Sequence, residues 1–510
     1  MKGDMKPLVA EQLELVKPLT VGFGNADYRM YVAIFKQAES ILAASGIETS
    51  FVQQQMEAYE HAGRKRAAKK GVSYKALSNP SRARVQKRFR KALRVKIASV
   101  WLDMAPRAAA VRIADSEVFR AFCLAERIDQ PQAPSKSEID RYDKLVPESA
   151  IRAIVNNLRG RAVQGDEAQI RALGLEEGLS LDEYFADTTC LRANIHFPVD
   201  WVLLNDGVKT IIKAILLIRR HGLKYRMPEP EQFIRGMNKL SMEMTQTARK
   251  LDSRCNRKKV LRSMKKLVRL VRRHAQRYRQ KLADEWRQTD LKRGQVDQIL
   301  KRLDAMIRKL PVASRQAHER IIGERAVKND EKLLSLYEAD LHVIVRRKAG
   351  AEVEFGNTLL LGEQSDGLIV DWKLLKDKSP GDAQLFKESI ERVHAVFGEY
   401  PGAAAGDRGC QSKGNSIWMG KAHIYDATTP RDPAQLKRRL NSCKFRKLQR
   451  RRSQTEGRIG ILKNDFLGRT LRSKGFANRE RAVAWAVLAH NLWLIARIGM
   501  EIKKEKREAA

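Results

Sequence analysis

The sequence predicts a mixed α/β chain, in which a long helical insertion interrupts one small sheet and an all-helical domain precedes it. Apolar residues recur at helical spacing through residues 1–180 and again through 211–345. Short apolar runs bounded by Gly and Pro, which are typical of strands, occur after residue 181. With 510 residues the chain is also too long for one ordinary core, so we expect about two to four structural units.

The N-terminal domain, residues 1–180, is predicted to be helical. Asn79 followed by Pro80 is a helix start signal, because Asn caps a helix end and Pro is tolerated in the first turn. One face of this helix is apolar at every fourth position: Val85, Phe89, Leu93 and Ile97. Basic residues crowd the rest of it: Arg82, Arg84, Lys87, Arg88, Arg90, Lys91, Arg94 and Lys96. Two interpretations stay open for them, a solvated face around a packed stripe and a surface that contacts DNA.

The sheet is predicted to begin in residues 181–210 and to be interrupted by residues 211–345. The run 190–197 is a strand closed by Pro198, and 201–220 is an apolar helix. From 211 to 345 the chain is highly charged and helical, with apolar residues three and four apart around Val260 and again around Ile299. This pattern predicts long helices in a hairpin or coiled-coil-like insertion, which acts as a packing stalk or as a basic arm along DNA.

Residues 346–510 are predicted to complete the sheet and to end in helix. Apolar runs at 353–361 and 368–375 flank a turn-rich hexapeptide, which predicts a hairpin. An amphipathic helix at 385–397 and a short strand of small residues at 402–410 follow, with a further strand expected at 423–425. The rest, from 433 to 506, is expected to be helical with a break near 468–475.

The charge of the chain indicates a polyanionic partner. Lys and Arg total 99 against 60 for Asp and Glu, so the formal net charge is +39. A charge excess of this size repels itself unless a polyanion neutralises it, and nucleic acid and an anionic membrane surface are the two candidates. Because 43% of the residues are hydrophobic, we expect the charge to lie on a folded scaffold.

The membrane is the weaker candidate. Residues 1–20 contain no apolar run suited to a signal peptide. The longest apolar stretch, 482–500, contains His490, Asn491 and Arg497, which predicts a buried core helix rather than a membrane span. The five cysteines are scattered singly and form no CxxC pair, which argues against a zinc finger or a disulfide framework and favours a reducing cytoplasm.

Three acidic residues are candidates for phosphoryl chemistry. Hard cations such as Mg²⁺ prefer oxygen ligands, so a polyanion-binding enzyme without Cys or His metal motifs needs carboxylates. Asp187 is expected at the beginning of the first strand, Asp407 at the end of the small-residue strand, and Glu456 in a densely basic helix. Periodicity alone does not exclude Asp371, which follows an apolar run, or Asp200, which follows the Pro198 turn.

The segments around these acids resemble those of bacterial insertion-sequence transposases of the DDE class. Segment 187–200 (DTTCLRANIHFPVD) is similar to the first catalytic segment of that class, and segment 406–410 (GDRGC) to the second. The third segment is the most specific: Arg452, Glu456 and Lys463 match the spacing Tyr-x-x-Arg-x-x-x-Glu-x-x-x-x-x-x-Lys, although Gln449 stands at the Tyr position. Residues 116–145, 474–475 and 489–492 also resemble the class, so the resemblance covers most of the chain outside 210–345.

The resemblance implies a ribonuclease-H-like catalytic core, a mixed sheet flanked by helices. In such a core Asp187, Asp407 and Glu456 would be catalytic and would bind two Mg²⁺ ions, with Mn²⁺ as a possible substitute. Water would cleave the phosphodiester at a transposon end, and the freed 3′-hydroxyl would attack target DNA in line. The enzyme would therefore be an endonuclease and polynucleotidyl transferase that carries out DNA recombination.

The implied partner is double-stranded DNA, both the terminal inverted repeats of an insertion sequence and the target. Arg452 and Lys463 are eleven residues apart, about three helical turns, and would share a face that holds phosphates. DNA contacts are also expected from Arg408, Arg450 and Arg451, and from the helical domain of residues 1–180. A homodimer on paired DNA ends and a location on the bacterial nucleoid follow by analogy with the class.

Two other functions remain open at this stage. A non-catalytic DNA-binding regulator, or a decayed transposase copy, would keep the basic helices and would not need the three acids. A structure-specific nuclease or junction resolvase would use the same core for cutting alone. The long basic additions at both ends of the core favour an enzyme that recognises particular DNA ends.

Overall fold

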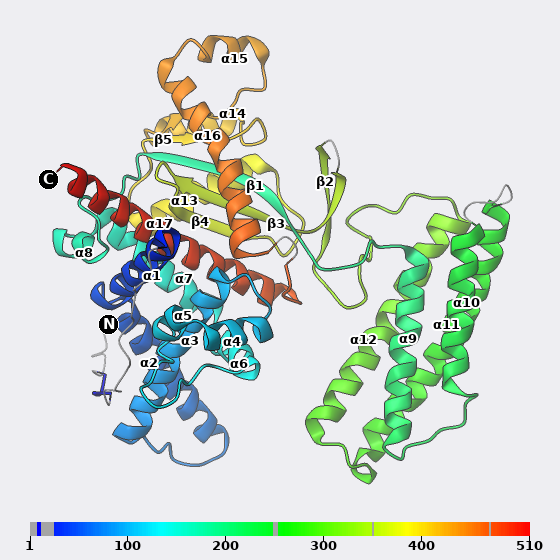
Figure 1. Ribbon diagram of the computed structural model, residues 1–510. Helices are drawn as coiled ribbons and strands as arrows, with labels where there is room; N and C mark the ends of the chain where they lie inside the picture. The colour runs from blue at the N-terminus through cyan, green and yellow to red at the C-terminus, as the bar shows by residue number, and fades with distance from the viewer. Residues whose placement is uncertain (1–7, 12–24, 248–252, 349–350, 469–470, 510) are drawn as a thin grey trace.

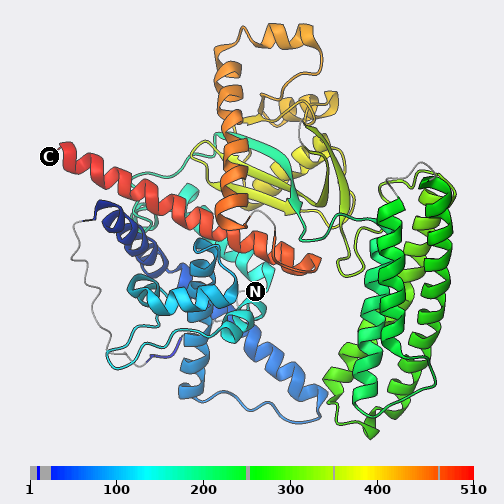
Figure 2. The same cartoon turned by 45° about the vertical axis from the view of Figure 1, so that its right-hand side comes forward.

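The computed structural model (Figure 1) describes residues 8–11, 25–247, 253–348, 351–468 and 471–509. A twisted sheet lies at the centre, the N-terminal helices and the C-terminal helix lie below it in this view, and a bundle of long helices stands apart to one side (Figures 1 and 2). Most of residues 1–20, where no signal peptide is expected, falls outside the described residues.

The N-terminal region is helical throughout its described part, as predicted. Its helices are α1 (Ala26–Ala44), α2 (Ile47–Lys69), α3 (Asn79–Trp101), α4 (Pro106–Asp115), α5 (Glu117–Phe122), α6 (Lys136–Leu145), α7 (Glu148–Gln164) and α8 (Glu167–Ala172). Pro80 stands in the first turn of α3, and Phe89, Leu93 and Ile97 are buried along its apolar face. A capping box between Ser135 and Glu138 starts α6, because each side chain satisfies a backbone N–H that the helix leaves unpaired.

Several basic residues of α3 are used inside this region. Arg94 is only 4% exposed and binds the carboxylates of Glu48 and Glu39. Lys96 pairs with Asp143 on α6. Both of the interpretations given above for this helix placed its charges at the surface, and for Arg94 that is wrong: its charge ties α3 to α1 and α2.

The sheet is mixed, so the α/β class predicted from the sequence is confirmed. Within the described residues it has the strands β1 (Glu183–Arg192), β2 (His342–Lys348), β3 (Ala351–Gln364), β4 (Ile369–Leu374), β5 (Ala403–Ala405) and β6 (Tyr425–Asp426). β3 is antiparallel to β1, β2 and β4, whereas β1 is parallel to β5 and β5 to β6. The predicted hairpin is the β3–β4 pair, and Gly367 in its turn has φ +88°, a conformation that favours glycine.

The first strand begins seven residues before the predicted start at residue 190. Because β1 covers Glu183–Arg192, Asp187 lies in its middle and not at its beginning. The strand signal was missed because Asp187, Thr188 and Thr189 interrupt the apolar pattern, although Tyr184 and Phe185 before them are fully buried.

The N-terminal helices and the sheet share a hydrophobic core, which the predicted domain boundary at residue 180 did not anticipate. The later helices are α13 (Asp382–Phe397), α14 (Lys413–Lys421), α15 (Pro433–Arg439), α16 (Cys443–Ile461), the π-helical turn η3 (Leu462–Phe466) and α17 (Phe476–Ala509). α17 contacts α1, α3, α7 and β4, and therefore joins the two regions.

The apolar stretch of α17 is a core helix, as predicted. Residues 476–503 are long and apolar enough to cross a membrane, but 72% of the most apolar window is buried within the protein. The Asn491 side chain hydrogen-bonds both backbone polar groups of Ile369 at the edge of β4. Complete burial lowers the pKa of the neighbouring His490 to about 4, so this imidazole is neutral near pH 7.

The insertion is a bundle with its own core. Its helices in the described residues are α9 (Asp200–Arg220), α10 (Pro230–Thr247), α11 (Ser253–Glu285) and α12 (Arg293–Ala317), with the short turns η1 (Trp286–Gln288) and η2 (His318–Ile322). The sequence predicted long helices in this region, but the insertion starts about ten residues before the predicted boundary at 211. α9 belongs to it because α9 packs against α10, α11 and α12.

Candidate active site

The two faces of β1 have different partners. Tyr184 points to the face covered by α13, where its hydroxyl lies 2.6 Å from the Ser389 hydroxyl. Phe185 points to the opposite face and packs in a small cluster with Phe445 and Leu448 of α16. Side chains alternate along a strand, so Asp187 shares the face of Phe185 and lies beneath α16.

Asp407 is brought beside Asp187 by strand register. Phe185 of β1 is paired with Ala405 of the parallel strand β5. Asp187 and Asp407 each lie two residues beyond this pair in the same direction, so the two carboxyl groups are neighbours. One oxygen of Asp407 accepts hydrogen bonds from the N–H groups of Gly409 at 2.8 Å and Cys410 at 3.2 Å, which fix the side chain in the turn after β5.

A buried carboxylate on β3 sets the position of α16. Glu363 is 0% exposed and stands opposite Phe185 in the β1–β3 register. Its oxygens accept hydrogen bonds from Arg451 at 3.1 Å, Thr455 at 2.8 Å and Arg458 at 3.2 Å. These three donors lie on one side of α16, so their bonds fix the rotation of the helix and with it the direction of Glu456.

The third predicted acid, Glu456, affects the pKa of Asp187. Burial, together with the negative charges of Asp407 and Glu456, raises the pKa of Asp187 to about 6. A hydrogen bond from the Thr188 N–H and the positive charge of Arg452 act in the opposite direction. The three predicted acids therefore influence one another: Asp187 is half-buried in β1, Asp407 is half-buried in the turn after β5, and Glu456 is exposed on α16.

The donor set suits a hard divalent cation, although the side chains are not drawn tightly together. Within the part of the chain that the structure describes, no three His, Cys, Asp or Glu side chains lie close enough to hold a metal ion as they stand. Like charges repel one another without a counter-ion, and Glu456 is exposed. The three residues therefore suit a divalent cation because they are carboxylates and because they lie in the same part of the structure.

A fourth acid, Asp382, borders the same place and was missed at the level of sequence. It is the first residue of α13, and its Oδ1 lies 3.4 Å from the Thr188 hydroxyl. A methyl group on Gly409 would lie 2.7 Å from Asp382 Oδ2 and 3.0 Å from Asp407 Oδ1, so both carboxylates adjoin one point. An acid in the first turn of a helix is ordinarily explained by the helix dipole. The sequence around Asp382 therefore gives no sign that it lies beside Asp407.

The two competing acids have structural roles. Asp371 is buried on β4, where Arg392 approaches it to 2.6 Å and Ser389 donates a hydrogen bond to it. Asp200 is buried at the start of α9 and binds Gln316 and Arg320, which closes the end of the bundle. Neither belongs to the acid cluster, and the structure decides what periodicity left open.

Comparison of the chain with protein-family models, with curated proteins and with solved structures gives no match.

Four of the five predicted DNA-contacting residues separate into three groups. Arg408 and Arg450 are exposed at the surface. The positive charge of Arg452 lowers the pKa of Asp187, and its Nε donates a hydrogen bond to Gln449 at 3.1 Å. Arg451 binds Ser365, Glu363 and Gln364 through all three of its nitrogens, so it is part of the fold and we withdraw it as a DNA contact.

Two further side chains attach α16 to the sheet: Gln449 within the helix and Lys463, the fifth predicted DNA contact, in η3 directly after it. The Lys463 amine donates to the backbone carbonyl of Cys190 at 2.9 Å and lies 3.3 Å from the Thr189 hydroxyl, both on β1. Gln449 accepts from Thr429 at 3.1 Å and donates to the Ala427 carbonyl, near the end of β6. The residue that departs from the expected Tyr therefore orients Arg452 and fastens the helix to the sheet.

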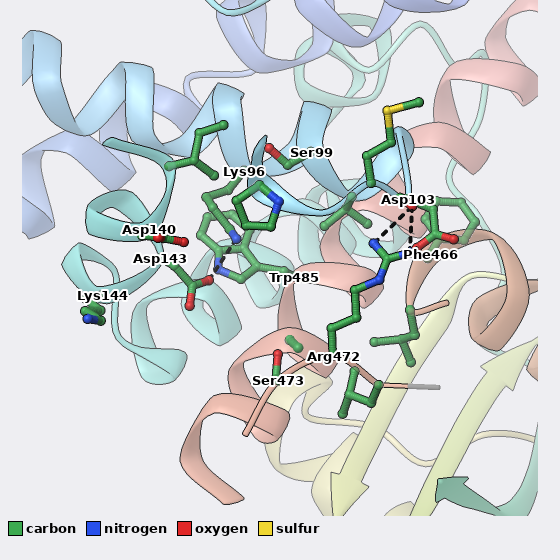
Figure 3. A pocket seen from close by; sticks show the side chains of 17 residues that line it. Lys96, Ser99, Asp103, Asp140, Asp143, Lys144, Phe466, Arg472, Ser473 and Trp485 are labelled. Carbon is green, nitrogen blue, oxygen red and sulfur yellow. Dashed lines mark hydrogen bonds and ion pairs between the residues drawn. The ribbon is translucent and has the colours of Figure 1, made fainter. Parts of the chain in front are cut away.

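A cavity lies elsewhere, between α3, α6 and α17 (Figure 3). It encloses about 410 Å³, and Trp485, only 1% exposed, forms part of its wall. Its acids are engaged, since Asp143 pairs with Lys96 and Asp103 with Arg472. This cavity therefore has none of the three predicted acids and no cluster of unpaired carboxylates.

Proposed function

We propose that this protein is a DNA transposase of the DDE class, which cleaves phosphodiester bonds at transposon ends and joins them to target DNA. The observation that carries the proposal is the proximity of Asp187, on β1, to Asp407, directly after the adjacent parallel strand β5, beneath a basic helix that carries Glu456. Neighbouring carboxylates repel one another, so a carboxylate cluster is electrostatically unfavourable, and it is unexpected in a chain whose net charge is +39.

The architecture supports the ribonuclease-H-like core that the resemblance implies. The sheet is mixed and has helices on both faces, α13 on one and α16 on the other. The helical bundle interrupts the chain between β1, which carries Asp187, and the strand that leads to Asp407. This agrees with the expected interruption between the early strands and the second catalytic segment.

Asp187, Asp407 and Glu456 are the residues that would hold the Mg²⁺ or Mn²⁺ ions, and Asp382 lies near enough to assist. When bound, two such ions activate the attacking oxygen and stabilise the leaving one. The chain itself supplies position: Glu363 and Lys463 fix α16, the turn at Gly409 fixes Asp407, and Arg452 offsets part of the negative charge. Exposed Arg408 and Arg450 would hold DNA phosphates beside the acids.

In the proposed reaction, water attacks the phosphorus at the transposon end and the 3′-oxygen leaves. That 3′-hydroxyl then attacks a phosphodiester of the target strand, whose own 3′-oxygen leaves. No covalent bond to the protein is needed in either step. We further propose that two copies act on paired ends, so that both ends are joined to one target.

The proposal is tested with Asp407→Asn and Glu456→Gln in the full-length chain, with Glu391→Gln on the exposed side of α13 as the matched control. The substrate is DNA carrying the sequences that flank the gene. Mg²⁺-dependent cleavage and strand transfer should fall at least about a hundredfold in both variants, since loss of a metal ligand costs several kcal/mol of transition-state stabilisation. DNA affinity and the control should be unchanged.

Undiminished cleavage by either variant would overturn the assignment of the acids. Cleavage without any strand transfer by the unaltered chain would instead favour a nuclease on the same core.

A further inference from the structure

One face of α11, the longest helix of the bundle, is exposed and continuously basic. Five exposed side chains recur at intervals of three or four residues and form what we name the α11 stripe: Lys259, Arg262, Lys266, Arg269 and Arg273. Intervals of three and four place residues on the same side of a helix, so the five charges are aligned. Over 14 residues the stripe extends for about 21 Å, with one charge roughly every 5 Å.

The stripe is not neutralised within the protein. No Asp or Glu occurs in α11 before Asp284, so the helix itself offers the stripe no acidic partner at intervals of three or four. Other basic residues of α11 do have partners across the bundle: Lys258 pairs with Glu324 and Arg279 with Asp304. Across the described residues no ion pair to an acid is found for the five stripe residues.

A solvated face on a stable bundle does not need this pattern. The opposite face of α11 is fully used, with Leu261, Met264 and Val271 at 0% exposure in the bundle core. Five aligned like charges repel one another and destabilise the isolated helix, since like charges three or four residues apart are unfavourable. The alignment is explained when a linear polyanion lies along it.

We propose that the α11 stripe binds the phosphate backbone of duplex DNA. A DNA duplex carries one negative charge per about 1.7 Å of its axis, so a straight row of cations 21 Å long faces many phosphates. A membrane surface suits the stripe less well, because an interfacial helix inserts an apolar face and that of α11 is buried in the bundle. The stripe carries no base-reading geometry, so the contact is independent of sequence.

The proposal takes its choice of DNA from the proposed function and gives the insertion a role in it. The bundle stands beside the sheet (Figure 2), so its stripe would hold DNA outside the active site. The contact would add to affinity and would leave the chemistry at Asp187 and Asp407 unchanged.

The test compares two full-length variants that each lose four charges from the bundle. The stripe variant is Arg262→Gln, Lys266→Gln, Arg269→Gln and Arg273→Gln, and the control is Lys213→Gln, Arg220→Gln, Lys301→Gln and Arg302→Gln, all exposed on α9 and α12. Binding of a labelled duplex is measured by anisotropy over a range of salt concentrations in EDTA, so that no cleavage occurs.

The stripe variant should bind at least about tenfold more weakly, and its log–log salt slope should fall by about 0.9 for each lost phosphate contact. The control should keep most of the slope. A variant in which Arg and Lys are exchanged at the same four positions keeps the charge and should bind like the unaltered chain. Circular dichroism checks that the bundle remains folded in each variant.

Equal losses in the stripe variant and the control would overturn the proposal, because net charge alone would then explain binding. An unchanged salt slope would overturn it as well. Binding to an RNA duplex and to phosphatidylserine vesicles is measured in parallel, and a loss of affinity for one of these without a loss for DNA would also overturn it. Failure here is distinguishable from failure of the proposed function, since Asp407→Asn protein is assayed for cleavage separately and should bind DNA normally.

Discussion

Asp187 lies half-buried on the face of β1 that α16 covers, with Asp407 and Glu456 as its acidic neighbours. Burial and these two charges raise its pKa to about 6 from its ordinary value of 3.8. The ionised form is therefore disfavoured in the folded chain unless a cation compensates it.

The first prediction concerns pH. Since the folded pKa exceeds the unfolded one, the contribution of Asp187 to stability is complete below about pH 4 and is lost as the pH rises through about 6. Without divalent ions, Asp187→Asn should therefore be more stable than the unaltered chain at pH 7.5, by roughly 3 kcal/mol, and the difference should shrink toward pH 4.

Thermal unfolding in EDTA at several pH values measures this difference. Added Mg²⁺ should raise the unfolding temperature of the unaltered chain at pH 7.5 and should have little effect on Asp187→Asn. Lower stability of the Asn variant at pH 7.5 in EDTA would contradict the assignment.

At the scale of elements, the direction of α16 depends on one buried carboxylate. Glu363 on β3 receives Arg451, Thr455 and Arg458, and Lys463 fastens the other end of the helix to β1. Glu456 follows Thr455 directly, so any rotation of α16 would turn it away from Asp187. Glu363 is thus a positioning residue rather than a catalytic one.

Replacing Glu363 by Ala should lower the free energy of unfolding by about 3 kcal/mol, because two half-buried guanidinium groups lose their buried partner. Mg²⁺-dependent DNA cleavage should fall with it, through displacement of Glu456. Chemical denaturation and a cleavage assay measure the two effects, with Glu391→Ala as the control expected to change neither.

A stability loss below about 1 kcal/mol for Glu363→Ala would mean that α16 is held by other contacts. Because Glu363→Gln keeps a hydrogen-bond acceptor, it should recover part of the stability.

At the scale of the whole molecule, hydrophobic cores and predicted domains do not coincide. The bundle has a core of its own, whereas the N-terminal helices and the sheet share one through α17. The predicted boundary at residue 180 marks a change of secondary structure and does not divide two independent units.

Two fragments test this division. Residues 199–323 should fold alone, because their buried side chains contact one another, and should give a cooperative helical melt by circular dichroism. Residues 181–510 should not fold, because removal of α1, α3 and α7 exposes the apolar face of α17. A cooperative transition in the second fragment would show that the sheet does not need the N-terminal helices.

By itself the sequence determined the helical N-terminus, the α/β class, the β3–β4 hairpin and a helical insertion, because these depend on periodicity and turn residues within short windows. It also marked Asp187, Asp407 and Glu456, through spacing and resemblance. Only the tertiary structure decided that Asp371 and Asp200 are structural, that Arg451 faces inward and that Asp382 adjoins the acids. Those outcomes depend on strand register and helix rotation, which join residues far apart in the chain and leave no local pattern.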